Sequence, residues 1–151
     1  SASFVSVLVD AGAVRERGLP IADYFLWNEI FEFTTRLLRG RRGLLCPDSV
    51  AVHKTRGFGG TETDPGDRFF YEVRNKIWLF TSSPGLAPGE RVLYLGSTLR
   101  RWFRTFAASS DRAVLRRALL RGTREGLRTR PRPTETVLRE VGVKVPPGTR
   151  A

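Results

Sequence analysis

Two carboxylates and an arginine are spaced along segment 25–37, FLWNEIFEFTTRL, so that they could act together. Asn28 is a suitable N-cap for a helix that begins at the next residue. On that helix Glu29, Glu32 and Arg36 would lie on one face, with both acids near its positive end. Such carboxylates could serve as a general base or bind substrate hydroxyls. The spacing also fits an ordinary helix with an acidic start and a Glu32–Arg36 ion pair, and both interpretations stay open here.

His53 is the only histidine, and it ends the strand-like run SVAVH just before the glycine-rich segment 54–66. A lone histidine is more often a structural hydrogen-bonding group than a ligand, and one histidine does not complete a metal site. A strand end that enters a long loop is nevertheless a place where ligands are commonly presented.

Arg74 and Asn75 form a polar pair within an aromatic segment, RFFYEVRNKIWLF. The spacing of the apolar residues predicts an amphipathic helix, on which such a pair could simply be solvated. An Arg-Asn pair among aromatic residues could instead bind a phosphate or sugar hydroxyls.

The formal net charge of the chain is +11, and arginine carries most of it. Arginine binds phosphate in a bidentate way, so the charge favours an anionic partner, which could be a nucleic acid, an anionic membrane surface or a diphosphate-containing substrate. A GC-rich genome would produce the same bias towards arginine.

The region from Arg91 to Arg132 contains twelve arginines and two acids. Within it the apolar residues Val114, Leu115, Ala118 and Leu119 lie beside Arg112, Arg116, Arg117 and Arg124. This is the pattern of a helix on an anionic membrane, and these four arginines are the candidate anion-binding residues. The pattern also fits a solvated helix face over a small core. No recognised nucleic-acid motif occurs here, so nucleic acid is not the expected partner.

The length of 151 residues suits one domain, and the single cysteine, Cys46, excludes an internal disulfide. No apolar run approaches the roughly 20 residues that cross a bilayer. Apolar, β-branched runs predict short strands at 4–9, 23–27, 43–47 and 49–53. Helical patterns are expected at 11–18, 29–39, 68–80, 91–109 and 111–127, with a short helix near the C-terminus. The expected fold class is α/β, and these few strands indicate part of a larger domain.

The segments GLPIADYFLWNEIFEFTTRLLRGRRGLLCPDSVAVHKT and DRFFYEVRNKIWLF, in this order, resemble the C-terminal, acceptor-side half of family-two inverting glycosyltransferases of the A-type fold. They are most similar to the actinobacterial galactofuranosyl- and rhamnosyltransferases that build cell-wall galactan. The resemblance covers residues 4–105. It implies an acceptor-side half of the catalytic domain over 1–66 and a helical, arginine-rich region over 67–130, followed by a short helix and a loose tail over 131–151.

The resemblance also implies site residues. The positions that match the family's tryptophan pattern are Trp27, Asn28, Glu29, Glu32 and Arg36. Glu29 and Glu32 would deprotonate or orient the acceptor, while Trp27, Asn28 and Arg36 would bind substrate or support the site. The family's catalytic base falls at Ile30, which cannot accept a proton. Either Glu29 has taken over this role or the base has been lost.

His53 matches a family histidine that resembles a ligand to the divalent metal, manganese or magnesium, on the donor diphosphate. Arg74 and Asn75 match the family's Arg-Asn pair. The family's Asp-any-Asp motif occurs nowhere in the chain. The nucleotide-binding half is therefore expected on a missing N-terminal half or on a partner chain, and the chain alone is expected to be inactive.

The sequence thus favours part of an enzyme that moves galactofuranose or rhamnose from a nucleotide sugar to a polyprenyl-diphosphate-linked acceptor, with inversion. Its expected location is cytoplasmic, at the inner face of the plasma membrane. The alternative is a non-catalytic basic module that binds an anionic membrane or nucleic acid. The position of Ile30 and the missing Asp-any-Asp motif favour this alternative, whereas the ordered series of motifs favours the transferase.

Overall fold

A computed structural model describes residues 5–54 and 64–144. Helices account for 62% of the described residues, and none of these residues forms a strand. The predicted α/β fold, half of an A-type glycosyltransferase with a few short strands, is therefore wrong for this part of the chain.

The strand predictions fail because the apolar runs find no neighbouring strand. Leu44 and Leu45 in one run and Val52 in the next are more than 80% exposed, in an extended segment with no regular structure. A strand is stable only when a second strand pairs with its backbone or its apolar face packs against the rest of the protein. The predicted strand at 23–27 is instead a 3-10 turn followed by an irregular connection. Residues 55–63, most of the glycine-rich segment, lie outside the described residues.

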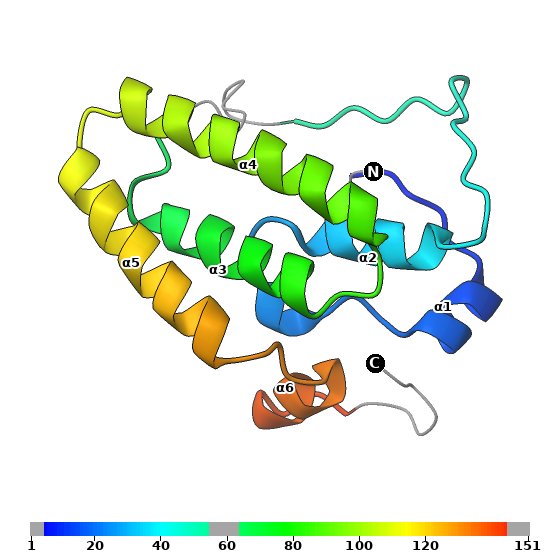
Figure 1. The fold of residues 1–151 in the computed structure, drawn as a ribbon. Coiled ribbons are helices and arrows are strands. Elements are labelled where there is room, and N and C mark those ends of the chain that lie inside the picture. The colour runs from blue at the N-terminus through cyan, green and yellow to red at the C-terminus, as the bar shows by residue number, and fades with distance from the viewer. Residues whose placement is uncertain (1–4, 55–63, 145–151) are drawn as a thin grey trace.

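The predicted helices are confirmed, with small changes in their bounds (Figure 1). The elements in chain order are α1 (Ala11–Arg17), η1 (Ala22–Tyr24), α2 (Glu29–Leu38), η2 (Gly66–Arg68), α3 (Phe69–Thr81), α4 (Pro88–Ala108), α5 (Arg112–Arg128) and α6 (Thr134–Glu140). Among these helices, none is long and apolar enough to cross a membrane.

The main core lies where α5 crosses α3. Buried residues of α3, including Phe70 and Val73, pack against Leu115 and Ala118 of α5. The helices approach closely because α5 has glycine at the crossing: a Cβ atom on Gly122 would lie 2.8 Å from the carbonyl oxygen of Phe70 and 2.9 Å from the Cβ of Val73. Glycine is therefore required at this point by the closeness of the two backbones.

Large aromatic side chains attach α4 to the other side of α3. The rings of Trp102 and Phe106 meet that of Phe69 edge to face, each at 5.7 Å between centroids. At its start, α4 has Pro88 at the first position, and the Glu90 carboxylate accepts a hydrogen bond from the Ala87 amide at 2.7 Å.

Two smaller contacts complete the fold. Phe33 and Leu37 of α2 pack against Ala13 of α1. At the other end of the molecule, the hydroxyl of Thr134 at the start of α6 accepts a hydrogen bond from the Ala22 amide of η1. The region after α5 is thereby held against the connection that leads into α2.

Candidate functional site

The connection that leads into α2 has an unusual backbone. Phe25, Trp27 and Asn28 all have positive φ, at 55°, 62° and 69°. Such values cost energy for residues other than glycine, and they persist only where the surroundings impose them. We call residues 25–28 the entry segment. Its conformation presents Trp27 and Asn28 immediately before the N-terminus of α2.

Asn75 holds the entry segment in this conformation. Its side-chain amide nitrogen lies 2.8 Å from each of three carbonyl oxygens, those of Tyr24, Leu26 and Trp27. Asn75 is completely buried, so these carbonyl groups have a donor where water does not reach.

Arg74, the neighbour of Asn75, also binds the backbone that leads into α2. Its guanidinium group donates to the Asp23 carbonyl at 2.7 Å and to the Asn75 side-chain oxygen at 3.1 Å, and pairs with Glu125 of α5 at 3.1 Å. The group also lies 4.3 Å from the centre of the Trp78 ring. Asn75 thus holds the entry segment from α3 and Arg74 holds Asp23 just before it, and the donors of both are engaged by the protein itself.

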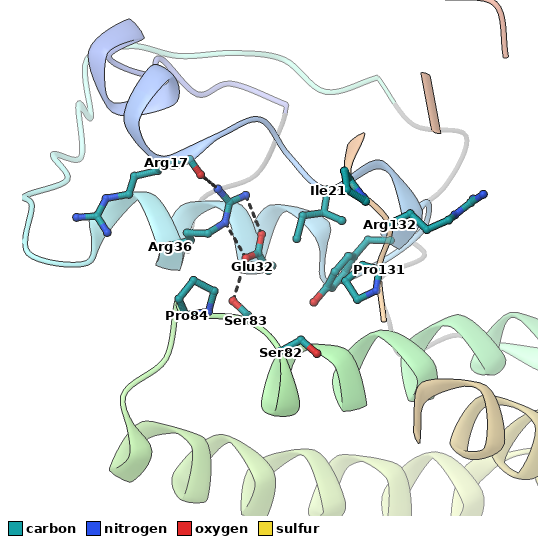
Figure 2. Close-up of a pocket in the computed structure, with 11 residues that line it drawn as sticks. Arg17, Ile21, Glu32, Arg36, Ser82, Ser83, Pro84, Pro131 and Arg132 are labelled. Atoms are coloured by element: carbon teal, nitrogen blue, oxygen red, sulfur yellow. Dashed lines mark hydrogen bonds and ion pairs between the residues drawn. The ribbon is translucent and has the colours of Figure 1, made fainter. Parts of the chain in front are cut away.

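Glu32 and Arg36 form a buried pair on α2 (Figure 2). The guanidinium group contacts both carboxylate oxygens, at 2.8 and 3.1 Å, and Ser83 donates a hydrogen bond to the same carboxylate at 2.9 Å. Arg36 also donates to the carbonyl groups of Arg17 and Leu19. The spacing of Glu32 and Arg36 therefore produces the i, i+4 ion pair that the sequence allowed. In addition, this pair ties α2 to the end of α1 and to the turn after α3.

A pocket of about 350 Å³ lies beside this pair, with Pro131 and Arg132 on its other side (Figure 2) and with Tyr24 also in its lining. Its cationic groups already have partners. Arg132 contacts Asp23 at 2.7 Å and Glu140 at 2.7 Å. Burial raises the pKa of Asp23, but hydrogen bonds from Arg132 outweigh this effect and keep that pKa below its ordinary value. The pocket consequently offers little free charge for an anionic ligand.

A second depression adjoins the entry segment. It is lined in part by Trp27, Glu72, Arg101 and Trp102, and has a volume of about 30 Å³. Glu72 of α3 organises it: one carboxylate oxygen accepts a hydrogen bond from Asn28 at 2.9 Å. The other oxygen pairs with Arg101 and lies 3.3 Å from the Trp102 indole nitrogen. Two indole rings, a carboxylate, an amide and a guanidinium group thus meet at one place.

Sequence reasoning did not select Glu72, Arg101 or Trp102 as site residues. Glu72 is the only acid in the aromatic segment that forms α3, and this signal could have identified it. No comparable signal marks Arg101 and Trp102, because they reach the site only through the packing of α4 on α3.

Glu29 and Ile30 point in different directions at the start of α2. Ile30 packs against the apolar cluster between α1 and α2. Glu29 is half-buried, and its Oε2 atom is shielded from solvent and has no hydrogen-bond partner among the described residues. Glu29 therefore keeps one carboxylate oxygen without a partner next to the entry segment, although it lines neither pocket.

His53 lies apart from these residues in both location and exposure. It is exposed in the extended segment after α2 and lines neither pocket described above. Within residues 5–54 and 64–144, no group of three or more histidine, cysteine, aspartate or glutamate residues could hold a metal ion. The described residues therefore do not fit a divalent metal site by themselves.

The four candidate arginines of α5 lie on a helix whose apolar stripe is already covered. Leu115 and Ala118 are completely buried against α3, so they are not available to a lipid surface. Arg112 donates to the carbonyl groups of Phe106 and Ala107 at the end of α4. The other three candidates, Arg116, Arg117 and Arg124, are exposed and have no partner among the described residues.

No family model, curated protein or solved structure matches this chain. The resemblance to glycosyltransferases consequently remains a prediction from the sequence motifs.

Proposed function

We propose that this chain is the acceptor-side part of a sugar transferase. The enzyme would move galactofuranose or rhamnose, with inversion, from a nucleotide diphosphate sugar to a lipid-linked cell-wall acceptor. The observation that supports this proposal most directly is the entry segment, where Asn75 holds an unfavourable backbone and Trp27 lies beside Glu72. Strained backbone that is held by its surroundings is concentrated at functional sites.

The groups at this place suit a sugar that binds on the surface, since the depression has the size of one water molecule and does not enclose a sugar ring. A sugar ring has an apolar face of C–H groups, which packs on aromatic rings, and an edge of hydroxyl groups, which need donors and acceptors. Trp27 and Trp102 offer indole rings, while the Glu72 carboxylate and the Arg101 guanidinium group are paired with each other, so a sugar hydroxyl would bind by replacing one of the hydrogen bonds of Glu72. An acceptor hydroxyl would take the place of Asn28 as donor to Glu72.

Glu29 is the proposed general base. Glu32 is unsuited to this role because Arg36 and Ser83 already occupy its buried carboxylate. In the proposed step, the Glu29 carboxylate takes the proton from the acceptor hydroxyl while that oxygen forms a bond to the anomeric carbon. The bond from this carbon to the nucleoside diphosphate breaks on the opposite face, which inverts the configuration. We assign donor binding to another part of the enzyme, since the chain has no Asp-any-Asp motif.

Acceptor binding tests the proposal without the donor. The 151-residue chain is titrated with a galactofuranose disaccharide, and binding is followed by nuclear magnetic resonance. Trp27→Ala should weaken binding roughly tenfold because it removes an aromatic surface from the sugar. Phe103→Ala provides a matched control, since Phe103 is an exposed aromatic residue of α4 away from the depression. Equal affinities for the wild type and the Trp27 variant would refute the proposed acceptor site.

A further inference from the structure

The outward face of α4 carries an unusual number of exposed apolar side chains. They are Val92, Leu93, Leu95, Leu99 and Phe103, with Phe103 76% exposed. Four of them follow one another at intervals of three or four residues and so form a stripe along the helix, with Leu93 beside it. Thr98 is buried and Trp102 packs against the core, and both lie on the side of α4 that directly adjoins the stripe, since they follow Leu95 by three and seven residues. Figure 1 shows α4 above α3, with the extended segment that follows α2 passing above part of α4 in this view.

Single exposed leucines are normal on protein surfaces, but a continuous apolar stripe on one helix usually marks an interaction surface. This stripe is bordered by Arg100 and Arg104, which are exposed and have no partner among the described residues. No acid occurs from Arg91 to Ser110. The outward face of α4 therefore combines apolar side chains with unpaired positive charge.

The outer face of α5 differs. Its exposed large apolar residues are Leu120 and Leu127, which lie two turns apart among arginines. The apolar stripe that the sequence indicated for a membrane is buried against α3. Thus α4, rather than α5, retains an exposed apolar face that is available for contact with lipid.

We infer that the outward face of α4 lies on an anionic membrane surface. In this position the stripe enters the boundary between headgroups and acyl chains, and Arg100 and Arg104 bind lipid phosphates. Charge complementarity favours lipid over a second copy of the chain. A symmetric dimer through this face would bring its unpaired arginines together without acids to neutralise them, in a protein whose net charge is +11.

The inference deepens the proposed function, because a lipid-linked acceptor would lie at the membrane that α4 contacts. It is nevertheless argued from α4 alone. The test therefore uses vesicles that contain neither acceptor nor sugar, so that a failure of membrane binding is distinguishable from a failure of the acceptor site.

The experiment is flotation of the 151-residue chain with two kinds of vesicle, phosphatidylcholine alone and phosphatidylcholine mixed with phosphatidylglycerol. We expect binding to the mixed vesicles and much weaker binding to the neutral ones. The double variant Arg100→Gln, Arg104→Gln should bind mixed vesicles roughly thirtyfold more weakly, at about fivefold for each arginine. The double variant Leu99→Gln, Phe103→Gln should lose at least about tenfold, because less apolar area is buried.

Matched control variants test whether α4, and not another part of the surface, binds the vesicles. Leu120→Gln changes an exposed leucine between arginines on α5, and Trp27→Ala changes the acceptor site, so both should bind vesicles like the wild type. Circular dichroism checks that all variants keep their helices. The inference is overturned if the Leu99 and Phe103 variant binds as well as the wild type. It is also overturned if Arg116→Gln with Arg117→Gln alone abolishes binding, or if the α4 face forms a dimer and binds no lipid.

Discussion

The side-chain amide of Asn75 donates to the backbone carbonyl of Trp27 across 2.8 Å, and the two residues are 48 positions apart in the chain. This contact joins the middle of α3 to the entry segment. Since Asn75 also binds the carbonyl groups of Tyr24 and Leu26, one buried side chain replaces the hydrogen bonds that a regular element would have provided.

Replacement of Asn75 should be among the most damaging changes in this protein. Asn75→Ala removes the side-chain donor that the carbonyl groups of Leu26 and Trp27 share with that of Tyr24, which keeps only the Leu26 amide, and we expect the free energy of unfolding to fall by about 2 to 4 kcal/mol. Urea denaturation followed by circular dichroism measures this change. Ser97→Ala removes one exposed hydroxyl from α4, which donates within its own helix, and should change stability by less than about 0.5 kcal/mol. A similar small loss for both variants would show that Asn75 does not support the entry segment.

Removal of only one partner of the Glu32–Arg36 pair should strongly lower the stability of the protein. Arg36→Ala leaves a completely buried carboxylate without its charge partner, and the expected loss of stability is about 3 to 5 kcal/mol. The double variant Glu32→Gln, Arg36→Met should lose less than the single variant, because no charge then remains buried. Thermal and urea unfolding of both variants check this order.

An exposed ion pair provides the control for this prediction. Asp67 and Arg121 pair at 3.0 Å with both side chains more than half exposed. Asp67→Asn should therefore change the free energy of unfolding by no more than about 1 kcal/mol. If it cost as much as Arg36→Ala, burial would not explain the importance of the α2 pair.

The helices and the Glu32–Arg36 pair were predictable because both depend on residues close together in the sequence. The entry segment was not predictable, since positive φ is normally indicated by glycine, and here Phe25, Trp27 and Asn28 adopt it in a segment held by Asn75 and Glu72, far along the chain. A tertiary contact decided this local conformation.

The wrong strand predictions and the two interpretations left open for α5 have a common physical cause. Alternation or periodicity shows which face of a segment is apolar, but it does not show what covers that face. Val52 lies in a strand-like run that has no neighbouring strand, while Leu115 belongs to a stripe that packs on α3 instead of lipid. The depression at Glu72 was missed for a similar reason, because its residues come from three different elements.

Two glycine-to-alanine substitutions should distinguish the effect of close packing on stability from the effect of helix propensity. Gly122→Ala places a methyl group against α3, where the Phe70 carbonyl oxygen would be 2.8 Å away. We expect a loss of about 1 to 3 kcal/mol from overpacking, measured by urea denaturation. Gly96→Ala on α4 has no neighbour within 4 Å and should stabilise the protein by about 0.5 to 1 kcal/mol. Stabilisation by both substitutions would contradict the close approach of α3 and α5.

Lys76 should make stability depend on pH in the alkaline range. Burial lowers the pKa of Lys76, and nearby Glu72 only partly opposes this effect. Between this lowered pKa and the unfolded value of about 10.4, the unfolded chain binds more protons than the folded one, so stability rises with pH. Lys76→Met should be more stable than the wild type at pH 7, and this difference should shrink as the pH rises through that window.

Denaturation curves of both proteins across the alkaline range test the sign of this effect. Lys54→Met is the matched control, since Lys54 is exposed and its replacement should leave the pH dependence unchanged. A stability difference between Lys76→Met and the wild type that is constant with pH would mean that the Lys76 charge is not penalised in the folded state.

The role proposed for Glu29 predicts a loss of catalysis without a loss of structure. In the chain joined to its donor-binding part, Glu29→Gln should lower the transfer rate at least about a hundredfold, because the amide cannot accept the acceptor proton. Acceptor affinity and the free energy of unfolding should change little, since Oε2 of Glu29 has no hydrogen-bond partner among the described residues. Glu16→Gln, at a half-exposed carboxylate that pairs with Arg17, should retain full activity. Retention of full activity by the Glu29 variant would remove Glu29 from the reaction, whereas lost acceptor binding would assign it to recognition instead of proton transfer.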